Sequence, residues 1–220
     1  IHDLNTGHIY EETYNKLILA PGAAPLRPTI PGADLPNVFT LRNLADTDRI
    51  KKIVDAGVER AVIVGAGFIG LELAENFVHR GIATTILDRN PQVLSPFDAE
   101  MTTPIATALA QKGVELLLGQ TAEAITPTAN GMSIKLTSGE TRTAQLVILG
   151  IGVRPENKLA VEAGLAVGPR GGIRVNEFLQ TNDPDIFAVG DVIETTDFGT
   201  GERTQVPLAG PANRQGRIAA

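Results

Sequence analysis

Apolar residues recur with a clear periodicity between residues 60 and 88. Residues 61–64 (AVIV) form a short, mostly β-branched apolar run, which is typical of a strand buried on both faces of a parallel sheet. Residues 69–77 carry apolar side chains at helical spacing, and residues 82–87 are again apolar. The pattern therefore predicts a strand, a helix and a second strand, which together make one βαβ unit.

The pattern after this unit predicts that the parallel sheet continues. Asp98 is expected to cap a helix whose apolar stripe consists of Met101, Ile105 and Leu109. Residues 114–118 follow this helix as the third strand of the sheet.

Three short segments rich in Thr and Ile come next, at residues 121–127, 131–137 and 141–144. An Asn-Gly turn and a Ser-Gly turn join them, and these are residue types that tight hairpin turns prefer. We therefore predict a three-stranded β-meander, after which residues 146–149 return to the parallel sheet.

The turn between the first predicted strand and its helix reads GAGFIG, residues 65–70. In a dinucleotide-binding unit Gly65 permits the tight turn, Gly67 lets a pyrophosphate approach the backbone, and Gly70 lets helix and strand pack closely. The phosphates then face the helix N-terminus. Asp88, at the end of the second strand, can accept hydrogen bonds from both hydroxyls of an adenosine ribose. A purely structural turn is the alternative. The strand before the turn, the helix after it and the position of Asp88 favour dinucleotide binding instead.

Other residues are expected at the same site. Gly150, Ile151 and Gly152 leave the last strand at the carboxyl edge of the sheet, where sheets of this kind bind their ligands. Arg80 and Arg89 flank the adenosine region in sequence, although a solvated positive charge is the alternative explanation for both.

Composition narrows the class of protein. The chain has 220 residues and a formal charge of −6 at pH 7, which argues against nucleic acid or an anionic membrane surface as the principal partner. Its apolar runs are far shorter than the roughly 20 residues of a membrane-spanning helix, so we expect a cytoplasmic protein without a membrane partner. The absence of cysteine excludes a disulfide framework, a Cys zinc site and a Cys nucleophile within these residues. His2, His8 and His79 are scattered, so neither a metal site nor a catalytic triad is expected.

Two further segments carry a family signature. Residues 181–191 read TNDPDIFAVGD, a Thr, four variable residues, a strand and then Gly-Asp, and residues 14–23 read YNKLILAPGA. With these segments the chain resembles the pyridine nucleotide-disulfide oxidoreductases, which are flavoproteins with two dinucleotide-binding domains. The first segment is similar to the second FAD motif of that family, and the other to its link from the FAD domain to the NAD domain. Pro21 and the ending at 207–220 resemble the branch of NADH oxidases and coenzyme A-disulfide reductases.

The resemblance implies an α/β fold with an inserted domain. A Rossmann-like NAD(P)H-binding domain, which has a parallel sheet plus the three-stranded β-meander, would span residues 34–155. Two partial segments of an FAD-binding domain, residues 1–33 and 156–220, would flank it. Both ends look cut, because the chain lacks an initiator Met and ends on a helical stretch without a C-cap Gly or a terminating Pro. By the resemblance, the family's first FAD motif and its redox-active cysteine would precede this chain, and a dimerisation domain would follow it. No catalytic residue is therefore expected within the 220 residues.

The resemblance also implies contacts with FAD, each with a simpler alternative. Asp191, after Gly190, would accept a hydrogen bond from a ribitol hydroxyl, whereas the simpler role is to cap the turn after a strand. Leu208 and Ala209 would begin a helix aimed at the flavin, whereas the simpler role of that helix is to pack on the sheet.

Inside the glycine-rich turn, Phe68 and Ile69 are expected beside the cofactors. Phe68 would be an aromatic gate over the flavin that moves aside for nicotinamide, and a buried core Phe is the alternative. Glu72, one turn into the helix, would lie near the nicotinamide, although the helix dipole also explains a Glu at this position.

By this resemblance, the full-length protein would pass hydride from NAD(P)H to FAD and on to a disulfide, a coenzyme A disulfide, a persulfide or oxygen. It would be a cytoplasmic homodimer acting on small molecules, and these 220 residues would be inactive alone. NADH is expected over NADPH because Asp88 would repel a 2′-phosphate, an effect that Arg89 softens. The alternatives are a ferredoxin or rubredoxin reductase-type flavoprotein without the cysteine, and a non-catalytic nucleotide-binding redox module.

Overall fold

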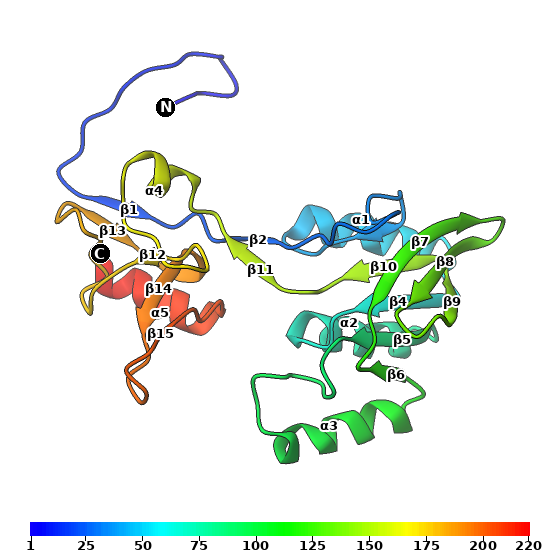
Figure 1. Cartoon of the computed structure of the whole chain (residues 1–220). Coiled ribbons are helices and arrows are strands. Elements are labelled where there is room, and N and C mark those ends of the chain that lie inside the picture. Colours follow the sequence, from blue (N-terminus) through cyan, green and yellow to red (C-terminus); the bar gives the residue numbers. More distant parts are fainter. The chain divides into compact units, whose positions relative to one another are not determined.

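The structure, a computed structural model, describes residues 1–220 and divides into two compact units (Figure 1). Unit 1 consists of residues 1–24 and 154–220, and unit 2 consists of residues 25–153. The domain boundary predicted after residue 33 falls inside unit 2, because Ala33 belongs to an apolar cluster of that unit. The assignment of the two units to FAD and NAD(P)H stays a prediction.

Unit 2 is built on a five-stranded parallel sheet in the order β3-β10-β4-β5-β6. The four longer strands and their parallel pairing were predicted from the apolar runs, and this prediction is confirmed. The elements of the unit are, in chain order, β3 (Val38–Phe39), α1 (Leu44–Asp55), β4 (Arg60–Val64), α2 (Phe68–His79), β5 (Ala83–Asp88), α3 (Ala99–Gln111), β6 (Glu115–Leu118), β7 (Ala122–Thr128), β8 (Gly131–Leu136), β9 (Thr141–Ala144) and β10 (Leu146–Leu149).

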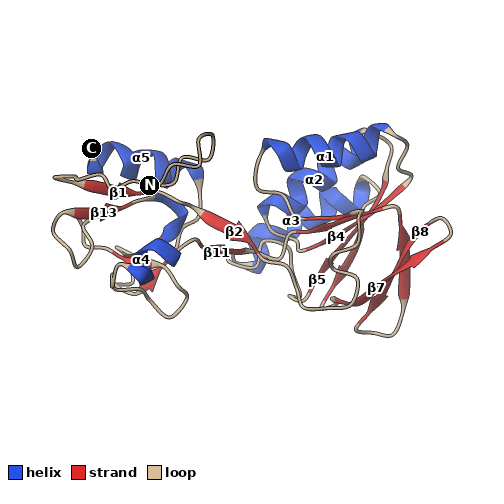
Figure 2. Ribbon diagram, turned by 90° about the horizontal axis from the view of Figure 1, so that it is seen from above, coloured by secondary structure: helices blue, strands red, loops and turns tan.

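The sheet is covered on both faces, which explains why its strands are continuously apolar. Successive side chains of a strand point to opposite faces. Ala61 and Ile63 of β4 therefore pack in the cluster that includes α1 and α2, while Val62 and Val64 pack in the cluster that includes the meander. Figure 2 shows helices α1 to α3 on one side of the sheet and strands β7 and β8 on the other.

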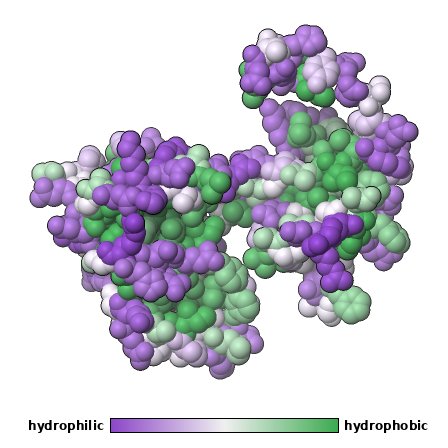
Figure 3. All heavy atoms as spheres, turned by 180° about the vertical axis from the view of Figure 1, so that it is seen from behind, coloured by the Kyte–Doolittle hydropathy of each residue, from purple (hydrophilic) through white to green (hydrophobic).

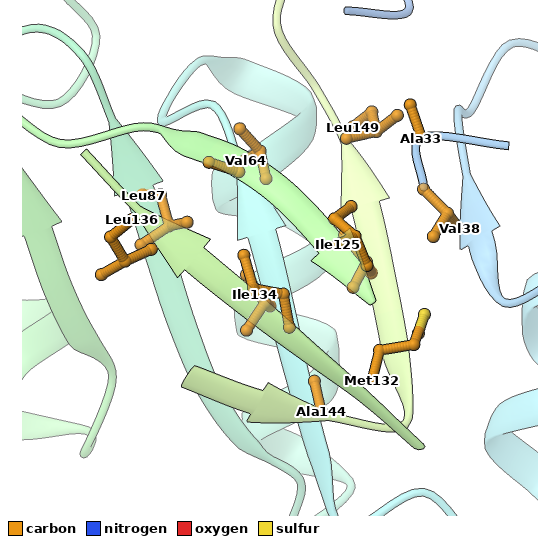
Figure 4. Packing of buried hydrophobic residues seen from close by; sticks show 13 residues of the cluster. Ala33, Val38, Val64, Leu87, Ile125, Met132, Ile134, Leu136, Ala144 and Leu149 are labelled. Carbon is orange, nitrogen blue, oxygen red and sulfur yellow. The ribbon is translucent and has the colours of Figure 1, made fainter. Parts of the chain in front are cut away.

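The meander consists of β7, β8 and β9, which pair antiparallel in that order, as predicted. Ile125 of β7 and Ile134 of β8 are fully buried against the sheet. Figure 4 shows these side chains and their neighbours in one continuous apolar layer. The arrangement of helices, parallel sheet and meander is the Rossmann-like fold class that the sequence predicts.

Helix α3 begins where predicted but presents a different face to the core. Asp98 occupies the N-cap position, yet its side chain makes no capping hydrogen bond. Met101 and Ile105 are 69% and 36% exposed, so the predicted stripe is wrong at these two positions. Thr102 is buried instead, and Ala106 packs against the core, because smaller side chains let the helix approach the sheet closely.

Helix α1 lies in a stretch for which the sequence analysis predicts no element, and its N-terminus is closed by a capping box. The Asn43 side chain accepts a hydrogen bond from Asp46 N, and the Asp46 carboxylate accepts bonds from the backbone N–H groups of Arg42 and Asn43. Arg49 forms an ion pair with the same carboxylate. Burial acts to raise the pKa of Asp46, but the hydrogen bonds from Arg49, Arg42 and Asn43 outweigh it and hold the pKa below its usual value.

Unit 1 brings together the two segments on which the family resemblance rests. Strand β1 (Leu17–Leu19) pairs in parallel with β13 (Ile186–Ala188). Lys16, just before β1, forms an ion pair with Asp185 at 2.5 Å. Thr181, the Thr of the second motif, shares its hydroxyl with the Ile186 carbonyl and with Asp183 N, so it closes the turn before β13.

The remaining elements of unit 1 surround a third apolar cluster, which includes residues of β12, β13, η1 and β14. β2 and β11, which pair with each other, contain the boundaries between the units. The elements are β1 (Leu17–Leu19), β2 (Ala23–Pro25), β11 (Val153–Pro155), α4 (Lys158–Glu162), β12 (Ile173–Arg174), β13 (Ile186–Ala188), the 3₁₀ turn η1 (Gly190–Val192), β14 (Ile193–Thr196), β15 (Arg203–Thr204) and α5 (Ala209–Ala219).

None of the helices has the length and apolar character that crossing a membrane would require. Exposed apolar side chains nevertheless occur in both units, such as Met101 on α3 and Phe198 between β14 and β15. On the face seen in Figure 3 such residues form patches between hydrophilic ones.

Gly67 and Gly70 differ in the space around them, which predicts different responses to an added methyl group. A Cβ on Gly70 would lie 2.1 Å from the carbonyl oxygen of Gly65, whereas a Cβ on Gly67 would meet no atom within 4 Å. Gly70→Ala should therefore lower the free energy of unfolding by about 1–3 kcal/mol. Gly67→Ala should change it by less than about 0.5 kcal/mol. Urea unfolding followed by circular dichroism measures both, and equal stability of the two variants would contradict the packing described.

The lowered pKa of Asp46 predicts that the folded protein loses stability in acid. Because its folded-state pKa is lowered, the carboxylate stabilises the fold above its unfolded pKa of about 4, and this contribution is lost as the pH falls through the folded value. Asp46→Ala should lower the free energy of unfolding near neutral pH by about 0.5–2 kcal/mol, and this difference should shrink in acid. Denaturant unfolding across the acid range is the measurement. Asp48→Ala, an exposed position of the same helix, is the control, and a difference for Asp46→Ala that does not vary with pH would refute the assignment.

Candidate functional site

The turns that follow β4, β5 and β10 meet at one edge of the sheet, because these strands are parallel neighbours. They line a cavity of about 620 Å³ that lies entirely within unit 2. The predicted site residues along this cavity are Gly65, Gly67, Phe68, Asp88, Arg89, Gly150, Ile151 and Gly152. The structure therefore brings together three segments that the sequence analysis assigned to one site.

The glycine-rich turn has the backbone features that a phosphate requires. Gly65 has a φ of 116°, and a Cβ there would lie 2.2 Å from the carbonyl oxygen of Gly150, so only glycine fits this position. Open space surrounds Gly67, and the next residue begins helix α2. The N–H groups that start the helix carry a partial positive charge, so an anion of the size of a phosphate can approach the backbone here. These features fit the pyrophosphate of a dinucleotide.

The carboxylate of Asp88 is held at the edge of the cavity by three hydrogen bonds. One oxygen accepts from Ala66 N at 2.7 Å, and the other accepts from the backbone and side-chain N–H groups of Asn90, both at 2.8 Å. A carboxylate has about four lone-pair positions, so roughly one remains for a ligand. Sequence reasoning expected Asp88 to accept from two ribose hydroxyls, whereas this geometry leaves room for one.

Two of the predicted residues in or near α2 and β5 line the cavity with exposed side chains, and two others lie outside it. Phe68 lines the cavity, is 48% exposed and makes an edge-to-face contact with Phe97 at 6.1 Å, so it is not a buried core residue. Arg89 also lines the cavity and is exposed. Ile69 and Glu72 are exposed on α2 and do not line the cavity.

Sequence reasoning missed part of the cavity wall. Residues 94–96 follow β5, residues 121–122 follow β6, and Leu26, Pro28 and Ile30 lie at the start of unit 2. None of these segments carries a recognisable motif. Position in the sheet is the one signal that could have found the first two, because each follows the carboxyl end of a predicted parallel strand.

The other predicted residues form a second group, in unit 1. Gly190 and Asp191 lie in η1, and Leu208 is the N-cap of helix α5, which begins at Ala209 as predicted. Gly190 has a φ of 81°, and its N–H donates to the side chain of Gln215 on α5 at 2.8 Å. This bond ties the Gly-Asp turn to the helix.

No set of three or more His, Asp or Glu side chains is arranged to hold a metal ion.

Comparison with known proteins gives a consistent result. A family model described as pyridine nucleotide-disulphide oxidoreductase matches residues 2–216. The chain is 38% identical over 215 residues to an NADH oxidase of Methanocaldococcus jannaschii, and 34% identical over 216 residues to a coenzyme A disulfide reductase of Staphylococcus aureus. These alignments cover 97% and 98% of the chain and 48% of each relative, so the chain spans about half the length of the curated relatives it matches.

The fold comparison agrees with the sequence comparison. The water-forming NADH oxidase of Lactobacillus brevis, solved with NADH bound, superposes with a TM-score of 0.92 at 34% identity, over 99% of this chain and 48% of the oxidase. The family model covers nearly all of the chain, and the glycine-rich turn, Asp88 at the end of β5 and the Gly-Asp turn are all in place. The chain belongs to the pyridine nucleotide-disulphide oxidoreductase family.

Proposed function

We propose that the chain is part of an FAD-dependent oxidoreductase in which unit 2 binds NAD(P)H at the cavity along the carboxyl edge of its sheet. In the full-length protein, hydride passes to FAD and on to a small acceptor, namely a disulfide, a coenzyme A disulfide, a persulfide or oxygen. The observation that carries the proposal is the open backbone at Gly67, placed between a strand and the start of α2, with the Asp88 carboxylate on the same cavity.

The relatives support this class of reaction. They are named NADH oxidase and coenzyme A disulfide reductase, so the first name gives an electron donor, NADH, and the second gives an acceptor, coenzyme A disulfide. Neither of these names favours a ferredoxin reductase or a non-catalytic nucleotide-binding module. The acceptor of this protein, its assembly as a homodimer and its place in the cytoplasm belong to the proposal for the full-length protein.

The residues of this chain would bind and orient the cofactors. When bound, a nicotinamide nucleotide donates a hydride that a flavin accepts. The N–H groups at the start of α2 would face the pyrophosphate, and Asp88 would accept a hydrogen bond from a ribose hydroxyl. Asp191 and the start of α5 in unit 1 would contribute to binding FAD.

Gly67→Val should weaken NADH binding severely, because the added side chain would occupy the open space that the pyrophosphate needs. In the full-length protein, flavin content should stay nearly normal, while flavin reduction becomes limited by hydride delivery. Stopped-flow measurement of flavin bleaching against NADH concentration gives the half-saturation and the rate.

Gly199→Val is the matched control for this experiment. Gly199 lies between β14 and β15 in unit 1, and a Cβ there would meet one side-chain oxygen of Asp197 at 3.5 Å, an ordinary contact. This variant should reduce its flavin like the parent. A folded, flavin-loaded Gly67→Val protein with unchanged half-saturation and rate would remove the glycine-rich turn from the nucleotide site.

NADH should bind more tightly than NADPH by about tenfold or more, because the Asp88 carboxylate would repel a 2′-phosphate. Arg89, which lines the same cavity, reduces this preference, so Arg89→Ala should widen it. Calorimetric titration of the chain with both nucleotides is the measurement. A tighter complex with NADPH than with NADH would rule out this role for Asp88.

A further inference from the structure

Leu94 has an unusual backbone conformation at the edge of the cavity. Its φ is 48°, and Leu179 is the one other residue apart from glycine with a positive φ. A leucine in this left-handed region is disfavoured, so the surrounding structure must hold it there. Leu94 lines the cavity and Leu179 does not. Leu94 is only 8% exposed, so its buried side chain can hold the backbone in this conformation.

The conformation of Leu94 directs its N–H at the glycine-rich turn. Leu94 N donates to the carbonyl oxygen of Ala66 at 2.9 Å, across a long separation in sequence. The N–H of the same alanine donates to the Asp88 carboxylate at 2.7 Å. Ala66 itself is buried, and both polar groups of its backbone are bonded, the N–H by the last residue of β5 and the carbonyl by the segment that follows this strand.

Fixing the Ala66 carbonyl also fixes the next N–H group. In a planar trans peptide the C=O of Ala66 and the N–H of Gly67 point in opposite directions. Because Leu94 holds this carbonyl on one side, the Gly67 N–H is directed to the other side. That N–H donates to no protein acceptor, and it belongs to the residue whose surroundings are open. A peptide free to rotate would lose this orientation.

We propose that Leu94 is a positioning residue for the nucleotide. Its left-handed backbone places its N–H on the Ala66 carbonyl and thereby aims the Gly67 N–H at the phosphate of the ligand. Leu94 does not need to touch the ligand for this role. The inference rests on the proposed function, since it assumes that a dinucleotide pyrophosphate occupies the cavity.

Two variants that lose the same side chain separate backbone conformation from packing. Leu94→Gly and Leu94→Ala both lose the buried apolar side chain that holds the backbone in this conformation. Glycine adopts a positive φ without cost even when nothing holds it there, and alanine does not. The dissociation constant of NADH should stay within about twofold of the parent for Leu94→Gly and rise about tenfold for Leu94→Ala. Leu94→Asn replaces leucine with a polar side chain of similar size, and asparagine tolerates this conformation, so it should bind like Leu94→Gly.

The measurement is calorimetric titration of the 220-residue chain with NADH and with ADP-ribose, after circular dichroism has shown each variant folded. ADP-ribose keeps the pyrophosphate and lacks the nicotinamide, so the same loss with both ligands is expected. A packing role predicts instead that Leu94→Gly binds no better than Leu94→Ala, and this result would overturn the inference. If Leu94→Ala fails to fold, Leu94→Val against Leu94→Asn gives the same comparison, because a β-branched residue disfavours a positive φ. Parent protein that binds neither ligand would overturn the proposed function, whereas normal binding by Leu94→Ala would overturn the role of Leu94 alone.

Discussion

Three stretches of backbone approach one another at the carboxyl edge of β4, and the rest of the site depends on this contact. The turn after β4, the first turn of α2 and the turn after β10 lie so close that a Cβ on Gly65 or Gly70 would overlap a carbonyl oxygen. The absence of side chains lets α2 start almost directly after the strand. Its N-terminal N–H groups therefore lie at the edge of the cavity rather than behind a loop.

The sheet can support such a contact because both of its faces are buried. Helices cover one face and the meander covers the other, and alternate residues of β4 contribute to each cluster. A strand packed on both sides has little freedom to shift, so the turns at its end keep their positions. The polar groups are concentrated at the edge, where Asp88 joins the glycine-rich turn to the segment after β5.

Unit 1 is held together by strand pairing between segments that are far apart in the sequence. β1 and β13 lie side by side, although most of the chain separates them, and their pairing places the Gly-Asp turn beside helix α5. The two motifs that suggest the family are therefore parts of one structural element. This explains how a chain that leaves unit 1 after residue 24 and returns at residue 154 can complete the same small core.

The sequence by itself determined the central strands, helix α2, the meander and the glycine-rich turn. These features follow from local causes, namely apolar periodicity, turn residues and the conformational freedom of glycine. Tertiary structure alone decided which face of α3 is buried, because the helical pattern allows both Met101 and Thr102 to face inward and only the fit against the sheet selects Thr102. It alone also revealed the strained Leu94, the bond from Ala66 to Asp88 and the wall after β6, since these depend on contacts between segments that lie far apart in the sequence.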